Sequence, residues 1–426
     1  MIRKIFLLLF FSFTACTAQL MSGRFTTSFY GWQGRDTSLA KQNYLRAYEN
    51  VQFNVGETHF FFNTNFQVSK DFGTVISSDP DLRLSSLVFQ GRNIADMIDV
   101  SLGRQFVFAG VGNGLMDGGV AKARFLSGMI GVTAYGGYNV VQSRTINLKR
   151  NFSDNALYGA QILFMPVTDG SLGISYMNRS RKPESFKAVR ADSLFNPEVI
   201  EIAYAPVEEE YASVDAEYTM SRVFNVYGRS DYDVNFERIS RAQLFTRVSV
   251  LTNVNVTGEY LFRQPRVAFN SIFSVFETNS TQEAEGGIEY APVPDIQTYV
   301  RYGYVSYTDD QSTRIRVGGT YRGVSVSYTR NLGYEGDLNG VSLQVVYPVF
   351  ERTLIPMIGF GYASYQVSQQ AEKNSVVNGT LGATYRPMQM LSVDIQMQWM
   401  RNRIYANDMR IFMKVSYWFS DRFLSF

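Results

Sequence analysis

Apolar and polar residues alternate with a period of two from Gly23 almost to the end of the chain. Residues 45–55 put apolar side chains on one face and polar side chains on the other, a tight turn follows at Gly56-Glu57, and the alternation resumes over residues 60–69. Two alternating runs joined by a short turn predict a β-hairpin. The same pattern recurs over residues 253–263, 391–399 and 410–419.

Soluble β-sandwiches also alternate, so alternation alone does not define the fold. The composition of the polar face distinguishes a membrane barrel from a sandwich. Asn, Gln, Arg, Ser and Thr occupy this face over about ten residues in strand after strand, and aromatic residues lie near the strand ends. Beyond residue 15 no apolar stretch is long enough for a transmembrane helix. Strands that are apolar at every second residue cross a membrane as a closed barrel. The sequence therefore predicts an all-β, antiparallel, up-and-down transmembrane β-barrel.

The connections between strands are predicted to alternate between short and long, which keeps both termini on the periplasmic side and makes the strand number even. The length of the chain fits about 22 strands, with 18–22 compatible with the pattern. The first strand begins near Gly23, so residues 19–426 are predicted to form a single barrel domain without a plug domain. Residues 199–205 fit either a further strand or part of a loop. The ten short connections are expected at 56–57, 93–97, 126–128, 166–168, 220–221, 250–251, 292–294, 322–323, 349–352 and 387–389.

The N-terminus has the layout of an export signal. Arg3 and Lys4 precede an apolar run over residues 5–15 that is too short to span a bilayer. Small residues at Cys16, Thr17 and Ala18 then predict a signal peptide over residues 1–18, cleaved before Gln19. A second interpretation makes residues 13–16 a lipobox with Cys16 lipidated. In either case the chain is exported, and without its only cysteine it has no disulfide or catalytic thiol.

Charge and composition limit the classes of partner that the chain is expected to bind. Lys+Arg total 40 and Asp+Glu total 38, and no basic stripe indicates nucleic acid. Membrane lipid and small solutes are the expected partners, and a protein partner in the lumen or the periplasm stays open. No cofactor is expected.

The final strand carries the pattern Ile411-x-Met413-x-Val415-x-Tyr417-x-Phe419, although Ser420 and Arg422 break the alternation counted back from Phe426. Over its whole length the chain thus resembles the outer-membrane β-barrel proteins of Gram-negative bacteria, in which the last strand ends in such an aromatic signal. Gly103-Arg104-Gln105 followed by Asp117-Gly118 is similar to a hairpin of some porin-like and polysaccharide-export barrels. The resemblance implies the architecture and an outer-membrane location, and it implies no substrate.

Enzymatic and metal chemistry have little support. Barrel enzymes that use a histidine base place it toward the outer leaflet or rim, whereas His59, the only histidine, lies beside the turn at Gly56-Glu57. We interpret it as a solvated residue and the protein as a non-enzyme. Three acidic segments could bind calcium weakly but fit ordinary turns or solvated loop edges; they are Asp79-Pro80-Asp81, Asp309-Asp310 and Glu208-Glu209-Glu210. The glycine-rich residues 110–119 open no helix, so a mobile or inward-folded loop is favoured over a phosphate-binding loop.

Arginines on the polar face are the strongest candidates for function. Ladders of charged side chains set the field and the selectivity of pores, here toward anions such as carboxylates, sulfates or acidic sugars. The alternative is structural, because inward acids could pair with these arginines and stiffen the wall. The predicted pore-lining residues are Arg46, Arg229, Asp231, Arg241, Arg247, Glu259, Arg263, Arg314, Arg316 and Asp394.

Three functions are compatible with these features. The first is a porin-like channel for passive diffusion of small, preferentially anionic solutes, its wide lumen narrowed by the connections over residues 139–154, 179–209 and 264–283. The second is a structural barrel that sheathes or anchors an export or electron-transfer component, which requires an unobstructed lumen. A barrel enzyme is the third, and the position of His59 disfavours it.

Overall fold

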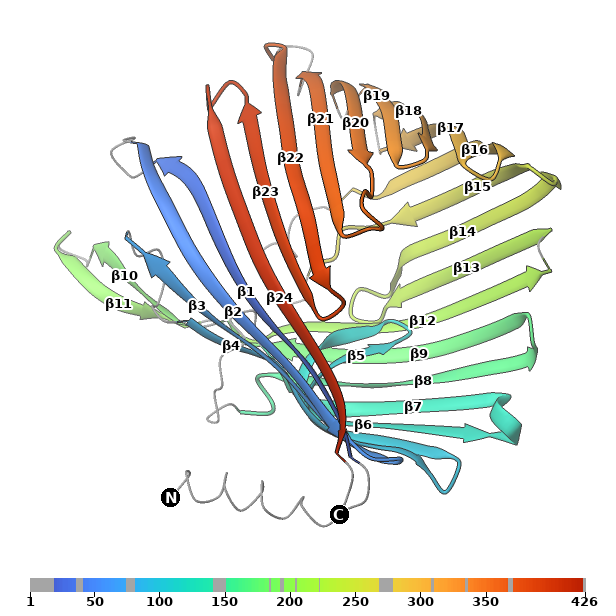
Figure 1. Cartoon of the computed structure of the whole chain (residues 1–426). Helices are drawn as coiled ribbons and strands as arrows, with labels where there is room; N and C mark the ends of the chain where they lie inside the picture. Colours follow the sequence, from blue (N-terminus) through green and yellow to red (C-terminus); the bar gives the residue numbers. More distant parts are fainter. Residues whose placement is uncertain are drawn as a thin grey trace.

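The protein closes a single antiparallel sheet of 22 strands on itself, with the first strand, β1, paired to the last, β24 (Figure 1). This confirms the predicted closed barrel and its strand number. Two further strands, β10 and β11, form a separate two-stranded sheet. The computed structural model describes residues 19–35, 41–73, 81–140, 151–183, 185–191, 195–203, 205–221, 223–267, 279–307, 310–333, 336–366 and 371–423.

The elements follow one another along the chain without interruption by another domain in the described residues. They are β1 (Gln19–Arg35), β2 (Lys41–Gly56), β3 (Phe60–Phe72), β4 (Asp81–Ile94), β5 (Ile98–Ala109), β6 (Gly112–Phe125), the 3-10 turn η1 (Leu126–Gly128), β7 (Ile130–Asn139), β8 (Ala156–Val167), β9 (Gly170–Arg181), β10 (Phe186–Ala191), β11 (Pro197–Ile202), β12 (Val207–Met220), β13 (Phe224–Asp233), β14 (Arg238–Leu251), β15 (Val254–Arg263), β16 (Thr281–Val293), β17 (Ile296–Ser306), β18 (Gln311–Tyr321), β19 (Val324–Gly333), β20 (Asp337–Val346), β21 (Leu354–Gln366), β22 (Asn374–Met388), β23 (Leu391–Arg401) and β24 (Asp408–Phe423).

Each strand presents one apolar and one polar face, as the period of two requires. In β17, Val300 and Tyr302 are more than half exposed to the surroundings, whereas Arg301 between them lies on the other face. Large apolar side chains are exposed in this way on nearly every barrel strand. An apolar band on one face of a closed sheet is the arrangement that contact with lipid demands. No helix among the described residues is long and apolar enough to cross a membrane.

Both ends of the barrel chain lie at the end where the short turns are. Leu20, near the start of β1, is in register with Gly56 at the turn between β2 and β3, and also with Arg422 near the end of β24. The turns themselves use left-handed backbone conformations, as at Arg322 (φ 43°) and Gly323 (φ 88°) between β18 and β19. The first and last strands therefore start and finish at the same rim of the barrel.

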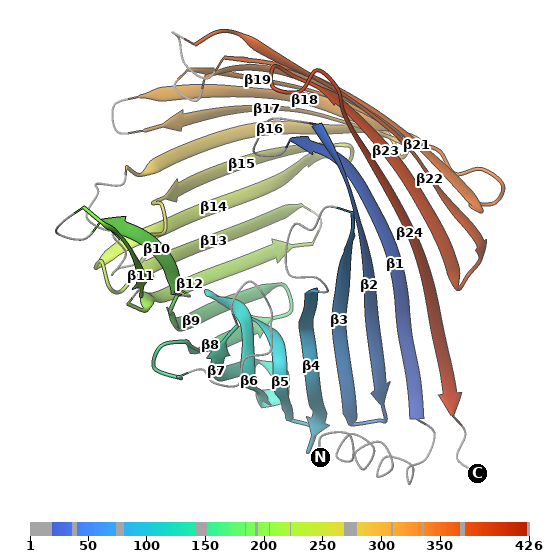
Figure 2. The same cartoon turned by 90° about the vertical axis from the view of Figure 1, so that its left-hand side faces the viewer.

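One hairpin leaves the plane of the wall. Strand β5 stays in register with β4 only from Ile98 to Arg104, and β6 stays in register with β7 only from Met116 to Phe125. Beyond these points residues 106–109 pair in the ladder with residues 112–115, and Gln105 pairs with Met116. This end of the hairpin folds into the interior of the barrel (Figure 2).

The bend is specified by Gly103, which has φ +123°. A Cβ atom at this position would lie 2.1 Å from the carbonyl oxygen of Leu87, so no side chain fits. Directly after the bend, Arg104 forms a two-point ion pair with Asp117 at 2.6 and 2.7 Å and also donates to the carbonyl of Leu84 at 3.2 Å. That carbonyl belongs to the part of β4 that β5 has left. The side chain of Arg104 thus donates a hydrogen bond to β4 at a position where β5 no longer pairs with it.

The tip of the hairpin is anchored on the inner side of the wall to β9, three strands along the sheet from β6. The backbone N–H of Val111 donates to Ser175 Oγ on β9 at 2.9 Å. Gly110 makes the turn with φ +62°, and a Cβ atom on it would lie 2.1 Å from the same Ser175 Oγ. Apolar residues of the hairpin and of the adjacent wall then form a buried cluster: Val107, Ala109, Val111, Met116, Val120, Tyr135, Leu157, Met177 and Tyr211. Residues 110–119 are therefore an inward-folded hairpin, which decides between the two alternatives that the sequence left open.

The connection between β9 and β12 holds the second sheet. Strands β10 and β11 pair from Phe186↔Ile202 to Ala191↔Pro197 and make no ladder with the barrel. The segment 199–205 thus begins in a strand, but a strand of this separate hairpin. Of the other two connections expected to narrow the lumen, residues 141–150 and 268–278 lie outside the described residues.

Candidate functional site

Charged side chains concentrate on the polar face of β14 to β18. Three glutamates of β16 lie in the middle of this group: Glu283, Glu285 and Glu289. Neighbouring strands on both sides supply five arginines that form ion pairs with them: Arg247 from β14, Arg263 from β15, Arg301 from β17, and Arg314 and Arg316 from β18. Two-residue spacing within each strand keeps these side chains on one face.

The ion pairs form a continuous chain along this face. Arg263 binds Glu283 at 2.8 Å, and Arg314 bridges to both Glu283 and Glu285 at 3.5 and 3.3 Å. Glu285 also accepts from Arg316 and lies 3.8 Å from Arg301. Glu289 completes the chain, since it binds Arg301 at 3.0 Å and Arg247 at 2.8 Å. Five guanidinium groups therefore share three carboxylates, an excess of two positive charges (5 − 3).

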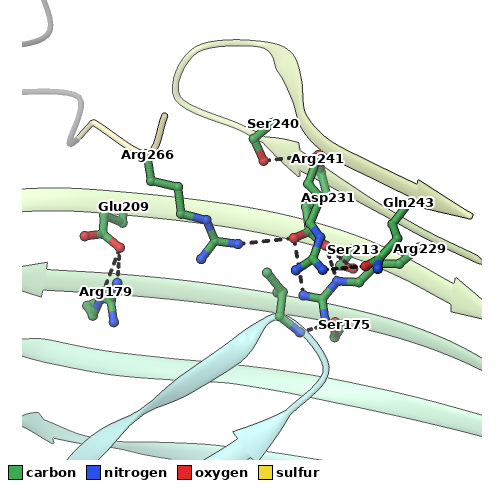
Figure 3. A network of polar contacts seen from close by, with 11 residues as sticks. Ser175, Arg179, Glu209, Ser213, Arg229, Asp231, Ser240, Arg241, Gln243 and Arg266 are labelled. Atoms are coloured by element: carbon green, nitrogen blue, oxygen red, sulfur yellow. Dashed lines mark hydrogen bonds and ion pairs between the residues drawn. The ribbon is translucent and has the colours of Figure 1, made fainter. Parts of the chain in front are cut away.

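A second cluster is centred on Asp231 of β13, whose side chain is fully buried (Figure 3). Its carboxylate accepts from Arg229 Nε at 2.7 Å and from Ser213 Oγ at 2.7 Å. Arg266, which follows β15, adds a third contact at 3.1 Å. One carboxylate is thus held between two guanidinium groups, an arrangement that compensates its buried charge.

Arg241 on β14 lies between the two clusters in the ladder, with Arg263 of β15 as its neighbour on one side. It stands opposite Asp231 in the ladder and donates to Gln243 Oε1, whose amide nitrogen in turn donates to Glu259 at 2.7 Å. The described hydrogen bond of its guanidinium is therefore made to a neutral amide. Its Nε is buried and has no hydrogen-bond partner among the described residues.

The Asp231 cluster lies against the tip of the inward hairpin. Val111 at the tip binds Ser175, which stands opposite Ser213 in the ladder between β9 and β12, and Ser213 donates to Asp231. A second link runs through Tyr211, which is buried in the same apolar cluster as Val111 and lies 4.7 Å beneath the guanidinium of Arg266. Figure 3 shows the turn of the hairpin below Arg229 and Ser175. The arginines and the hairpin tip therefore share one region of the interior.

Two of the predicted residues lie elsewhere on the wall. Arg46 of β2 forms a two-point ion pair with Asp71 of β3, at 2.5 and 2.7 Å. Asp394 of β23 accepts from Thr384 Oγ1 at 2.5 Å and binds Lys414 Nζ at 3.1 Å. Both acids pair with the residue directly across the ladder. These are local cross-strand pairs, and the structure does not bring them to the arginine-rich region.

Sequence reasoning missed several members of the site. Glu283, Glu285, Glu289 and Arg301 obey the same parity as the predicted residues, so the alternation over residues 281–293 and 296–306 could have identified them. Arg266 carries no such signal, because it lies beyond the last residue of β15. Its role comes only from the tertiary contact with Asp231.

His59 and the acidic segments show ordinary contacts. His59 Nδ1 lies 3.0 Å from the carbonyl oxygen of Arg92, across the turn region. Glu209 pairs with Arg179, Glu210 accepts from Tyr176 Oη at 2.7 Å, and Asp81 pairs with Arg83 at 2.7 Å. Asp79, Pro80 and Asp309 lie outside the described residues. Among the residues that are described, no group of three or more His, Cys, Asp or Glu side chains is arranged to hold a metal ion.

No family model and no curated protein matches the chain. The ferric enterobactin receptor PfeA of Pseudomonas aeruginosa has a similar structure, with a TM-score of 0.58, 7% identity, and coverage of 94% of this chain and 80% of the receptor. The chain is a β-barrel of the outer-membrane type. Two further structures similar to this outer-membrane barrel are the siderophore receptor PirA of Pseudomonas aeruginosa (TM-score 0.57, 10% identity, 94% and 80% coverage) and a BenF-like porin from Pseudomonas fluorescens Pf-5 (TM-score 0.44, 10% identity, 95% and 99% coverage). At these identities the likeness to the two receptors shows the fold alone.

Proposed function

We propose that the protein is an outer-membrane channel for passive diffusion of small solutes, with a preference for anions. The observation that carries this proposal is the local excess of arginine over acid in the ion-pair chain of β14 to β18, on the polar face of a closed 22-stranded wall. A barrel of this size encloses more space than the side chains of its wall can fill. A polar lumen with a positive field favours the entry of anions over cations.

The orientation follows the rule for bacterial barrels, in which the short turns face the periplasm. In this proposal the short-turn rim and both strand termini are periplasmic, and residues 1–18 are the signal peptide removed on export. The longer connections, including the β10–β11 hairpin, then lie at the outer surface. In the same proposal the ten predicted pore-lining residues belong to the wall of this lumen, and the arginine-rich face of β14 to β18 gives it a local excess of positive charge.

The hairpin β5–β6 supports a narrowed channel over a sheath for a partner. A sheath requires an open lumen, whereas this hairpin extends into the interior and is anchored there through Val111 and Ser175. In the channel proposal the hairpin supplies the constriction that the connections were expected to supply. Solute crosses by diffusion, and no energy coupling is required.

The test is single-channel conductance of the purified protein in a planar bilayer, with a salt gradient across the membrane. We expect steady current steps and a reversal potential that indicates anion preference. Replacing Arg241 and Arg247 by Gln removes two positive charges and should shift the reversal potential toward cation preference. The matched control is Arg322→Gln, which removes a charge at an exposed turn where Arg322 pairs with Asp295, and it should leave selectivity unchanged. A folded protein that gives no current would rule out the channel.

A further inference from the structure

The ladder of the wall is broken between β4 and β5. Residues 81–84 and Ser86 of β4 stay paired with β3, but β5 pairs with β4 only as far as Leu87↔Arg104. Leu82 and Leu87, toward the two ends of this stretch of β4, are 51% and 42% exposed, as the lipid-facing side chains of the wall are. The break in the ladder therefore lies within the apolar band of the barrel.

An ion pair stands at this break, on the side of the wall that faces lipid. Two-residue spacing puts Arg104 on the same face of β5 as Leu102, which is 57% exposed. The side chain of Arg104 is nevertheless buried, because it pairs with Asp117 at 2.6 Å and donates to the carbonyl of Leu84 at 3.2 Å. Charged groups at membrane depth are costly and mark functional positions. The place where β5 leaves the wall is thus marked by charge as well as by its backbone.

The lipid-facing face of β5 continues past this ion pair into the barrel (Figure 2). The register of β5 with β6 runs without a bulge over residues 98–109, so side chains keep alternating through the bend at Gly103. Phe106 and Phe108 therefore share a face with Leu102, and they are 54% and 76% exposed. One apolar face thus leads from the membrane into the interior, with the ion pair at the point where it leaves the wall.

The wall does not cover the two phenylalanine rings. Val107 and Ala109, which alternate with them, are buried in the apolar cluster formed with β7, β8, β9 and β12, so the rings point away from that part of the wall. Their centroids are 4.5 Å apart, and they form one surface. Apolar surface left in water costs about 25 cal/mol per Å², and a persistent apolar patch marks a contact site.

We propose that Phe106 and Phe108 form a site for an acyl chain of a membrane lipid, which enters the barrel between β4 and β5 past the ion pair. The occupant follows from continuity, because the same face of β5 contacts lipid at Leu102. An acyl chain covers the rings without needing a charged or hydrogen-bonding partner beside them. The inference goes beyond the proposed channel, because it gives the barrel interior a lateral connection with the membrane that ion conduction does not require.

Quenching of tryptophan fluorescence by brominated acyl chains tests the site. The protein is reconstituted in bilayers of phosphatidylcholine that carries bromine on its acyl chains. Phe106→Trp and Phe108→Trp each add one tryptophan to the three of the unsubstituted protein, which sets the background. We expect the added fluorescence to be quenched in both variants, and more strongly at position 106, which is nearer the break. Leu102→Trp on the wall is the positive control and should be quenched most.

Two further variants identify the route. Phe412→Trp is the matched control for an aromatic residue inside the barrel, because Phe412 lies on the polar face of β24, opposite Tyr30 of β1. Bromine on the acyl chains should leave its fluorescence unchanged. The double variant F106D/F108W puts a carboxylate between the break and the probe. It should lose the quenching seen in Phe108→Trp, because a charge in the path of an acyl chain is unfavourable.

The outcomes separate this site from the channel. Quenching at positions 106 and 108 that is no greater than at position 412 overturns the acyl-chain site. Undiminished quenching in F106D/F108W also rejects it, because bromine then reaches the probe by another route. Ion current through the same preparations is measured in parallel, and circular dichroism confirms that each variant is folded. A quenched protein without current overturns the channel and keeps the site, whereas a conducting protein without quenching does the reverse.

Discussion

The polar faces of β14–β18 and of β19–β22 belong to one continuous sheet, yet their chemistry differs. The first is built from ion pairs, with Glu285 alone contacted by Arg301, Arg314 and Arg316. The second uses hydroxyl and amide groups, as in the 2.7 Å contact between Ser327 and Ser342 across β19 and β20. Corresponding positions on this uncharged stretch are Ser325, Thr329, Gln344, Asn378 and Thr380.

This difference shows that the wall does not need charge in order to form. Backbone hydrogen bonds close the barrel equally well over both stretches, and small polar side chains are sufficient on the uncharged one. Ion pairs that are partly buried contribute little net stability, because desolvation offsets their attraction. In the proposed channel the arginine-rich stretch therefore serves selectivity, and the uncharged stretch serves the wall alone.

Loss of the Asp231 carboxylate should give the largest effect on stability. Asp231→Asn removes a fully buried acid and leaves the largely buried Arg229 and the partly exposed Arg266 without their shared partner; breaking a buried ion pair typically costs about 3–5 kcal/mol. Unfolding in urea, followed by tryptophan fluorescence in detergent micelles, measures the change. Ser342→Ala on the uncharged stretch is the control and should change the free energy of unfolding by about 0.5 kcal/mol or less. Equal losses in the two variants would show that the Asp231 carboxylate, on β13 beside the charged face, is not needed to compensate Arg229 and Arg266.

Displacement of the hairpin tip should have the second-largest effect on stability. Gly110→Val places a side chain where a Cβ atom already lies 2.1 Å from Ser175 Oγ, and such overpacking costs about 1–3 kcal/mol. We expect the tip to leave its anchor and single-channel conductance to rise. Gly286→Val is the matched control, because a Cβ atom there meets nothing within 4 Å. Unchanged conductance in Gly110→Val would show that the hairpin does not limit the current.

Removal of one exposed ion pair should have the smallest effect on stability. Arg247 is about half exposed and pairs with Glu289, which keeps Arg301 as a second partner. Arg247→Gln should therefore lower the free energy of unfolding by about 1 kcal/mol or less. The same variant should shift the reversal potential in a salt gradient, and high salt should reduce that shift through screening. A large stability loss would mean that the arginines serve the wall after all.

The barrel could be predicted from the sequence because its determinants are local. Alternation fixes the faces, and turns such as Gly56-Glu57 fix the hairpins, so strand number and architecture follow from residues that are neighbours in the chain. The predicted polar-face positions of Arg314 and Arg316 follow from the same parity. The ion-pair partners of these arginines cannot be predicted from parity, because Glu285 contacts Arg316 only when β16, β17 and β18 lie side by side.

The inward hairpin could be anticipated only as one of two alternatives. Glycines around Gly110 indicate an unusual backbone, but the contact that directs the tip inward is with Ser175, 64 residues away. The position of Arg266 depends in the same way on Asp231, 35 residues earlier. Such contacts are set by the closure of the whole sheet, and no local pattern encodes them.

Departure of β5 from the wall also has a mechanical consequence. The ladder between β4 and β5 ends at Leu87↔Arg104, whereas the seam that closes the barrel, between β1 and β24, runs from Gln19↔Phe423 to Trp32↔Arg410. Under lateral tension in the membrane, we expect a barrel to separate first between the two strands that share the fewest paired residues. We expect this barrel to open transiently between β4 and β5, where the side chain of Arg104 donates to the carbonyl of Leu84 beyond the ladder, and to stay closed where the two ends of the chain meet.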